Sequence, residues 1–322
     1  MIEFITQNMM YFLLIVGFAL IIFSSNVLID AASSIALKLK VPKILVALTI
    51  VSFGTSAPEM AISLQSVQSL NGEMAFSNII GSTVVNACLI LGIASFLKPI
   101  RVKHQTIKKE LPILLLITFG FAILMLDSLF NPLTPNAFSR ADGIILLLLF
   151  SIFVLYLVQM LFRRGNIEEE VHIKYPPVLA IILLIVSLFL ISFSSDLIVQ
   201  NAEKIAFSLG ISEKIITMVV IVVGTSLPEL VMTILSTKKG EFDLAIGNIV
   251  GTNIFNICVV LGLPVTIYGD ILLTGFGIVD ILAVVASSTL LFFFARSERV
   301  ITKKEGIVLL LTFLIYYIYI WL

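Results

Sequence analysis

Charged residues are scarce in this sequence. Asp, Glu, Lys and Arg make up 12% of its 322 residues, hydrophobic residues make up 59%, and the mean hydropathy is +1.15. A water-soluble domain of this length needs far more charge to cover its surface, so the composition predicts an integral membrane protein. The apolar runs are long and continuous rather than short and alternating. We therefore expect membrane-spanning helices instead of barrel strands.

Cysteine is also rare. Cys88 and Cys258 both lie in apolar runs, which argues against a disulfide framework or a cysteine metal site. The H-E-x-x-H and G-x-S-G motifs are absent, so an intramembrane hydrolase is disfavoured and we expect no enzyme activity. The net formal charge is zero, which gives no sign of a nucleic-acid partner. No basic residue precedes the first apolar run, so we expect a retained helix there rather than a cleaved signal peptide.

Ten apolar segments are each about long enough to cross a hydrocarbon core of roughly 30 Å at 1.5 Å per residue. They cover residues 9–30, 42–69, 75–97, 106–126, 140–162, 176–200, 212–237, 243–267, 277–295 and 303–322. The connections are short apart from two polar stretches, 127–139 and 163–175. The sequence thus predicts an all-α membrane protein of ten transmembrane helices with no soluble domain.

The distribution of lysine and arginine predicts the orientation. Seventeen of the 20 basic residues fall on the side that holds the turn between the first two segments, and only Arg140, Lys204 and Lys214 fall on the other. Basic residues collect on the cytoplasmic side of membrane proteins. We therefore expect a multi-pass protein of the cell membrane with both termini outside.

An internal repeat divides the chain. Residues 54–59 read G-T-S-A-P-E and residues 224–229 read G-T-S-L-P-E, 170 positions later. At the same offset, residues 41–92 match 211–262 at 14 of 52 positions, mostly at Gly, Ser, Thr, Pro, Asn and Glu, which hydrophobicity alone does not produce.

This repeat predicts two five-helix units, residues 1–162 and 176–322, joined by a polar cytoplasmic connection at 163–175. Because five is odd, the second unit must be inverted relative to the first. Inverted repeats are a transporter architecture, with the binding site near the membrane midplane where the halves meet.

The repeated hexapeptides carry the polar chemistry. Ser52, Thr55, Ser56 and Glu59 fall at i, i+3, i+4 and i+7, which places them on one face of a helix. The second copy supplies Thr225, Ser226 and Glu229 at the corresponding positions.

A proline interrupts each copy. Pro58 and Pro228 have no backbone N–H, so the carbonyl groups of Gly54 and Gly224 lose their helical partners and a kink is expected. Freed carbonyls beside hydroxyls and carboxylates form an all-oxygen ligand set, which suits hard cations such as Ca²⁺ and Na⁺.

The segments that follow each hexapeptide supply a second polar layer. Its members are spaced i, i+4 and i+8 in both copies, as Asn78, Ser82 and Asn86 and as Asn248, Thr252 and Asn256. Glycines in these segments are expected to let the helices approach their neighbours closely, at Gly81, Gly92, Gly251 and Gly262. A serine or asparagine stripe alone more often means hydrogen bonding between helices, and a proline alone more often means a kink. Two equivalent carboxylates inside the membrane favour function because burying them is costly.

These motifs are specific to one family. G-T-S-x-P-E followed by N-x-x-G-S/T-x-x-x-N, present twice, resembles the sodium/calcium exchanger family of the cation/calcium antiporter superfamily. The resemblance implies ten helices, a central cluster of sites that exchange several Na⁺ for one Ca²⁺, and a mobile pair formed by the first and sixth helices. It makes Glu59 and Glu229 the central ligands, with Thr55, Ser56, Thr225 and Ser226 beside them and Ser82, Thr252, Asn86 and Asn256 around them.

Two positions depart from some relatives. Asn256 stands where potassium-dependent members have Asp, which disfavours coupling to K⁺, and Thr252 replaces the usual Ser. The expected function is antiport of Na⁺ and Ca²⁺ by alternating access, without a cofactor, by a monomer in the lipid bilayer. A proton-coupled or other divalent-cation antiporter on the same scaffold, and a passive channel, remain the alternatives.

Overall fold

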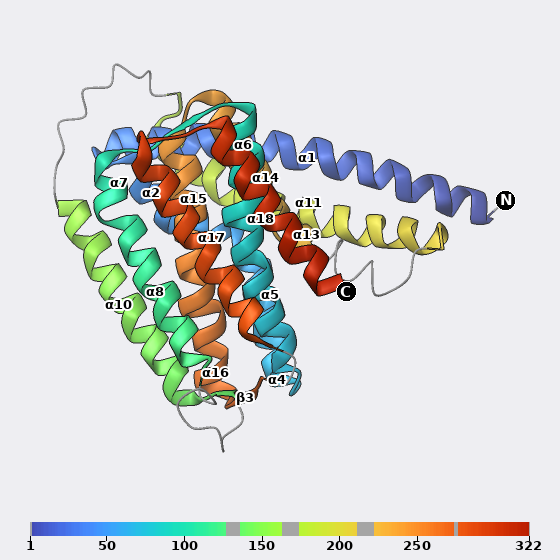
Figure 1. Cartoon of the computed structure of the whole chain (residues 1–322). Helices are drawn as coiled ribbons and strands as arrows, with labels where there is room; N and C mark the ends of the chain where they lie inside the picture. The colour runs from blue at the N-terminus through green and yellow to red at the C-terminus, as the bar shows by residue number, and fades with distance from the viewer. Residues whose placement is uncertain (1, 127–135, 163–173, 211–221, 274–275, 322) are drawn as a thin grey trace.

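The computed structural model describes residues 2–126, 136–162, 174–210, 222–273 and 276–321. Two helices, α1 (Ile2–Leu39) and α11 (Pro177–Ser208), are much longer than most of the others. They pack along each other and run at a steep angle to the rest of the bundle (Figure 1). The prediction of a mostly helical membrane protein is confirmed.

The remaining helices form the bundle. Its periphery consists of α7 (His104–Lys108), α8 (Glu110–Leu124), α10 (Arg140–Phe162), α17 (Ile278–Ser297) and α18 (Lys303–Trp321). Its centre holds two continuous spans, each with a π-helical turn in the middle. One is α5 (Gly72–Val84), η2 (Val85–Ile90) and α6 (Leu91–Leu97), and the other is α15 (Phe242–Phe255), η4 (Asn256–Leu261) and α16 (Gly262–Tyr268).

Two further spans are interrupted. The first consists of α2 (Lys43–Val46), the π-helix η1 (Ala47–Val51), α3 (Ser52–Thr55) and α4 (Ala57–Gln68). The second is described as α13 (Val222–Thr225) and α14 (Leu227–Lys239), and residues 212–221 of the segment predicted there lie outside the described residues.

Exposure of apolar side chains separates the periphery from the centre. In the described residues, six helices are long and apolar enough to cross a membrane, or seven if the bent pair 43–55 and 57–68 is one span. The most apolar windows of the two central spans are 78% and 89% buried, against 22% for α10. Leu148 and Leu155 on α10 are more than half exposed. The outer helices therefore present an apolar surface to lipid, as a membrane protein requires.

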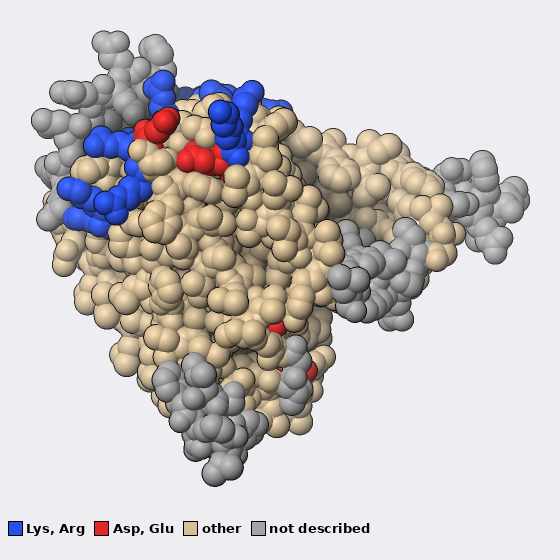
Figure 2. Space-filling view, viewed as in Figure 1, with Lys and Arg blue, Asp and Glu red and all other residues tan. Residues whose placement is uncertain are grey.

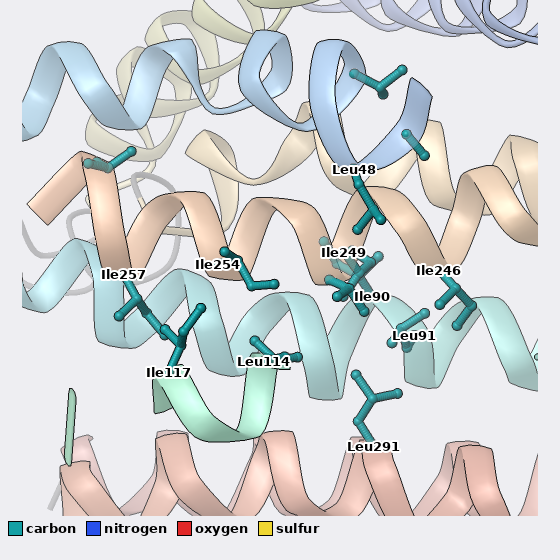
Figure 3. Close-up of a cluster of buried hydrophobic side chains, with 14 of the residues drawn as sticks. Leu48, Ile90, Leu91, Leu114, Ile117, Ile246, Ile249, Ile254, Ile257 and Leu291 are labelled. Atoms are coloured by element: carbon teal, nitrogen blue, oxygen red, sulfur yellow. The ribbon is translucent and has the colours of Figure 1, made fainter. Parts of the chain in front are cut away.

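Aliphatic side chains hold the central spans in place. Figure 3 shows Leu48 of η1, Ile249 of α15, Ile90 of η2 and Leu114 of α8 meeting in one buried cluster. Close packing, rather than exclusion of water, supplies the attraction between helices in lipid. The cluster fixes the separation of the central spans and so positions the polar side chains between them.

Glycines shorten the distance between helices, as predicted. A Cβ atom at Gly251 would lie 2.3 Å from the Ser52 hydroxyl oxygen and 2.9 Å from the Leu48 Cα atom. At Gly92, a Cβ atom would lie 2.8 Å from the Leu310 side chain. No larger residue fits these contacts without a shift of the helices.

Residues 170 positions apart meet inside the bundle. The Thr118 hydroxyl of α8 donates to the Ser288 hydroxyl of α17 at 3.3 Å, and the Asn253 side chain donates to the Thr83 carbonyl at 3.5 Å. Two antiparallel strand pairs also join the halves of the chain, β1 (Ile100–Arg101) with β4 (Val300–Ile301) and β2 (Ala137–Phe138) with β3 (Ile271–Leu272). The two halves are thus intertwined rather than separate.

Lysine and arginine gather at one end of the molecule, here called the basic end (Figure 2). Several of these lysines pair with acids there. Lys43 lies 2.8 Å from Glu241, Lys103 lies 2.7 Å from Asp243, and Asp30 of α1 binds both Lys174 and Lys239. Hydrogen bonding to Asp30 raises the pKa of Lys174. The Asp30 pairs tie α1 to the end of α14 and to the residues that precede α11.

Candidate functional site

Both hexapeptides break their helices. Ser56 and Ser226 leave the helical conformation, with ψ angles of 7° and 9°, and α4 and α14 begin at the next residue. Pro58 and Pro228 then occupy the first helical turn, where a missing N–H costs nothing. The axis bends by 49° between the first span's two parts. The predicted kink is confirmed.

The carbonyl group that Pro228 frees has found a new donor. The Ser195 hydroxyl of α11 donates to the Gly224 carbonyl oxygen at 3.0 Å. Its counterpart 170 residues earlier, Ser25 of α1, is buried and has no hydrogen-bond partner among the described residues. The two halves therefore differ in how α1 and α11 meet the broken spans.

Helix α11 contacts both breaks. A Cβ atom at Gly54 would lie 2.6 Å from the Leu188 side chain, and one at Gly224 would lie 2.4 Å from the Val199 side chain. Leu188 and Val199 both belong to α11. This long helix thus passes directly over the two points where the backbone bends.

Glu59 and Glu229 lie in the first turns of α4 and α14, and both side chains are fully buried. The positive end of a helix dipole stabilises a carboxylate at that position. The negative charge of Glu229 acts on Glu59, so the structure brings the two predicted central ligands together. Thr55 of the first copy lies next to Glu229 of the second.

Within the part of the chain that the structure describes, neither glutamate has a cationic neighbour. Among the described residues, no oxygen atom of either carboxylate has a hydrogen-bond partner and no ion pair involves them. No third acidic, histidine or cysteine side chain joins them in a metal-binding group within the described part of the chain. Buried charges without a partner are costly, so such a pair of carboxyl groups is balanced either by protons or by a cation.

Each broken span packs against the central span of the other copy. Helix α3 contacts α15, and α13 contacts α5. Across the first contact, the Ser52 hydroxyl lies 3.1 Å from the Asn248 carbonyl oxygen, and the Thr55 hydroxyl lies 3.4 Å from the Asn248 side-chain oxygen. This crossed arrangement places each hexapeptide beside the polar layer of the opposite copy.

The two central spans also bond to each other. The Asn86 side chain donates to the Asn253 side-chain oxygen at 3.0 Å, and the Asn256 side chain donates to the Ser82 hydroxyl at 3.4 Å. Asn86 belongs to the π-helix η2, and Asn256 begins η4. Such π-helical turns are frequent at functional sites. The side-chain nitrogens of Asn86 and Asn256 thus donate hydrogen bonds between the two spans. Their side-chain oxygens have no partners among the described residues.

All eleven predicted ligands are buried. Seven of them have a side-chain oxygen without a hydrogen-bond partner among the described residues, namely Glu59, Glu229, Ser56, Ser226, Thr252, Asn86 and Asn256. These atoms are all carboxylate, hydroxyl or amide oxygens, the ligands that Ca²⁺ and Na⁺ prefer. The residues present therefore fit a hard cation as cargo.

Three of the predicted ligands donate hydrogen bonds from their hydroxyl groups to backbone carbonyl oxygens. Ser52 donates to Ala47 at 2.6 Å, Thr55 to Ser52 at 3.3 Å and Ser82 to Ile79 at 3.2 Å. A hydroxyl that donates its proton away still has a lone pair for a cation. Ser52 also contacts Gly251 and the Asn248 carbonyl, so it joins α3 to α15 as well.

Sequence reasoning missed two participants. Asn253 accepts a hydrogen bond from Asn86. The residue equivalent to Asn253 in the first half is Thr83, so a search for residues identical in both halves does not find Asn253. Ser195 lies outside the hexapeptides, and its bond to Gly224 depends on how α11 crosses the span. A search for polar residues inside apolar runs would find both.

Comparison with known proteins identifies the family. The family model described as sodium/calcium exchanger protein matches residues 9–159 and 179–322. The chain belongs to the sodium/calcium exchanger family. It is therefore a cation transporter of the membrane and not an enzyme, and the resemblance drawn from the two hexapeptides is confirmed.

Individual proteins that are similar to this chain agree with this. The inner membrane protein YrbG of Escherichia coli is 36% identical over 265 residues, which cover 79% of each chain. The putative antiporter CaxA of Alkalimonas amylolytica is 38% identical over 258 residues, 77% of each chain. A solved structure of the sodium-calcium exchanger NCX_Mj superposes with a TM-score of 0.81 at 27% identity, covering 95% of this chain and 97% of that one.

Proposed function

We propose that the protein exchanges Na⁺ for Ca²⁺ across the membrane at the site built on Glu59 and Glu229. The observation that carries this proposal is the set of buried, unpartnered oxygens around two carboxylates that have no cationic neighbour among the described residues. The name of NCX_Mj, a sodium-calcium exchanger with the same fold, supports the choice of ions.

The architecture proposed for this exchange has ten helices in two inverted repeats, residues 1–162 and 176–322, with the polar connection 163–175 on the cytoplasmic side. Contacts between residues 170 positions apart, such as Thr118 with Ser288, support a twofold relation between the halves. The crossed packing of α3 on α15 and of α13 on α5 supports it as well. The basic end then faces the cytoplasm, with both termini outside.

The charges make exchange obligatory. Two glutamates give the site a charge of −2, which one Ca²⁺ or two Na⁺ neutralise, and a third Na⁺ leaves +1. A carrier without cations holds two close carboxylates away from water, and their repulsion at low dielectric amounts to several kcal/mol, on the order expected for buried like charges. The unloaded carrier therefore does not switch sides.

The long helices α1 and α11 are the proposed moving elements. Helix α1 packs against α14, where Leu227, Val231 and Leu235 are half-buried. The corresponding face of α4, at Ala57 and Gln65, is exposed. This difference favours a state closed at the basic end and open at the other, and sliding of the two long helices would reverse it.

Selectivity follows from the neutral amides. With Asn86 and Asn256 at equivalent places, Glu59 and Glu229 are the only carboxylates that the described residues contribute to the proposed site. This disfavours K⁺ as a third transported ion. Thr252 keeps the hydroxyl of the usual Ser and adds a methyl group that narrows the space beside Asn256.

Uptake of radiolabelled Ca²⁺ into proteoliposomes tests the proposal. Vesicles loaded with Na⁺ and diluted into Na⁺-free buffer should accumulate Ca²⁺, and vesicles with Na⁺ on both sides should not. Uptake driven by a proton gradient without Na⁺ would instead establish the proton-coupled alternative. Uptake without any counter-ion would establish a channel.

A further inference from the structure

A pocket lies at the basic end, between α7 and α17. Its volume is about 470 Å³, and it is lined by His104, Ile107, Lys108, Phe292, Arg296 and Arg299. Three cationic side chains and one imidazole share this lining with two apolar side chains, and no acidic residue is among them. None of these residues belongs to the cation site, so the pocket is a separate feature.

A strand pair builds the pocket from the two halves of the chain. Arg101 of β1 pairs with Val300 of β4, and the Val102 N–H donates to the Arg299 carbonyl at 2.8 Å. Arg299 adopts a left-handed backbone conformation with φ of 57°, which is uncommon for residues other than glycine. The strands thus hold Arg299 beside His104 even though about 195 positions separate them in the sequence.

The cations of this pocket differ from four lysines at the same end of the molecule. Lys43, Lys103, Lys174 and Lys239 are each paired with Asp or Glu. Within the described residues, Lys108, Arg296 and Arg299 make no ion pair.

The charges of two of them, Lys108 and Arg299, act on His104. Desolvation, together with the positive charges of Lys108 and Arg299, lowers the pKa of that histidine. Positive charges crowded into a concave site without a counter-ion favour an anion.

We propose that this pocket binds the phosphate group of an anionic membrane lipid. Arg296 and Arg299 would hold the phosphate oxygens, because guanidinium groups bind them in a bidentate way. Ile107 and Phe292 would contact the glycerol and the first acyl carbons. Phe293, the next residue on α17, is 57% exposed and continues the apolar surface toward the membrane. Basic pockets between helices on the cytoplasmic side bind such headgroups.

Native mass spectrometry of the purified full chain tests the lipid site. Dioleoylphosphatidylglycerol should bind, and dioleoylphosphatidylcholine should bind at least tenfold more weakly. Because each basic residue near an anionic lipid contributes about fivefold to binding, Arg296→Gln with Arg299→Gln should weaken phosphatidylglycerol binding by about 25-fold. Lys108→Gln alone, at an exposed helical position, should weaken it by about fivefold.

The matched control removes two charges elsewhere at the basic end. Lys38→Gln with Lys40→Gln should leave the affinity within about twofold, because a pocket rather than the overall charge binds the lipid. Unchanged binding in both pocket variants, or an equal loss in the control, would overturn the proposal. Displacement of the lipid by equimolar inorganic phosphate would also overturn it, in favour of a soluble anion. Neither result bears on Na⁺-driven Ca²⁺ uptake, which tests the cation site separately.

Discussion

The Ser195 hydroxyl donates to the Gly224 carbonyl oxygen at 3.0 Å, whereas Ser25, its equivalent in the first half, has no partner among the described residues. Both serines are buried and both precede a proline-broken span. The two serines are 170 positions apart, so the inequality arises from how α1 and α11 pack on the broken spans. It distinguishes the two long helices in this state.

Replacement of each serine by alanine should therefore have unequal effects. Ser195→Ala leaves the Gly224 carbonyl unpaired in a buried site and should lower the free energy of unfolding by about 1 to 3 kcal/mol. Ser25→Ala removes a hydroxyl that makes no bond and should change stability by less than about 0.5 kcal/mol. Thermal unfolding in detergent without Ca²⁺ measures both. Equal losses would contradict the asymmetry.

The two glutamates should each be indispensable for transport. Glu59→Gln or Glu229→Gln keeps the shape of the side chain but removes half of the site's charge, so Na⁺-driven Ca²⁺ uptake should fall to background. Folding should persist, since glutamine keeps the shape of glutamate and no ion pair of either carboxylate is lost among the described residues. Glu203→Gln on α11 serves as the control and should transport normally. Normal flux in both site variants would refute the assignment.

Much of the site follows from local chemistry. A proline has no N–H to donate to a helical hydrogen bond, so the breaks near Pro58 and Pro228 were predictable. The repeat also pointed to Glu59 and Glu229, which the structure brings near each other. The 170-residue offset likewise predicted which spans would be equivalent. These features depend only on residues that are near one another in sequence or repeated at a fixed interval.

Other features depend on tertiary packing and escaped prediction. The π-helical turns at η1, η2 and η4 have no signature in the residues that form them. Ser25 and Ser195 look alike in sequence, so their different contacts could not be anticipated. The role of Asn253 arises because α15 crosses η2 where Asn86 lies. Each requires the arrangement of helices in space.

Close packing at Gly251 should be essential to the alignment of α3 with α15. The added methyl group of Gly251→Ala would collide with the Ser52 hydroxyl and with the Leu48 backbone, which cannot rotate away. We expect a loss of about 1 to 3 kcal/mol in the free energy of unfolding, as for other overpacked sites, together with weaker Ca²⁺ binding. Gly120→Ala on α8 is the matched control, because its new Cβ would lie at an ordinary 3.5 Å from Leu149. Similar melting temperatures for the two variants would count against this packing role.

Protons should compete with the transported cations. Protonation of Glu59 or Glu229 removes one of only two negative charges that hold Ca²⁺, so acidification should weaken Ca²⁺ binding and alkalinisation should strengthen it. The change should appear as a rising KM for Ca²⁺ as pH falls from about 8 to about 5, the range in which paired buried carboxylates take up protons. Saturating Ca²⁺ should restore most of the rate, because the proton and the cation exclude each other. A maximal rate that falls while KM stays constant would instead mean that protons act away from the two glutamates.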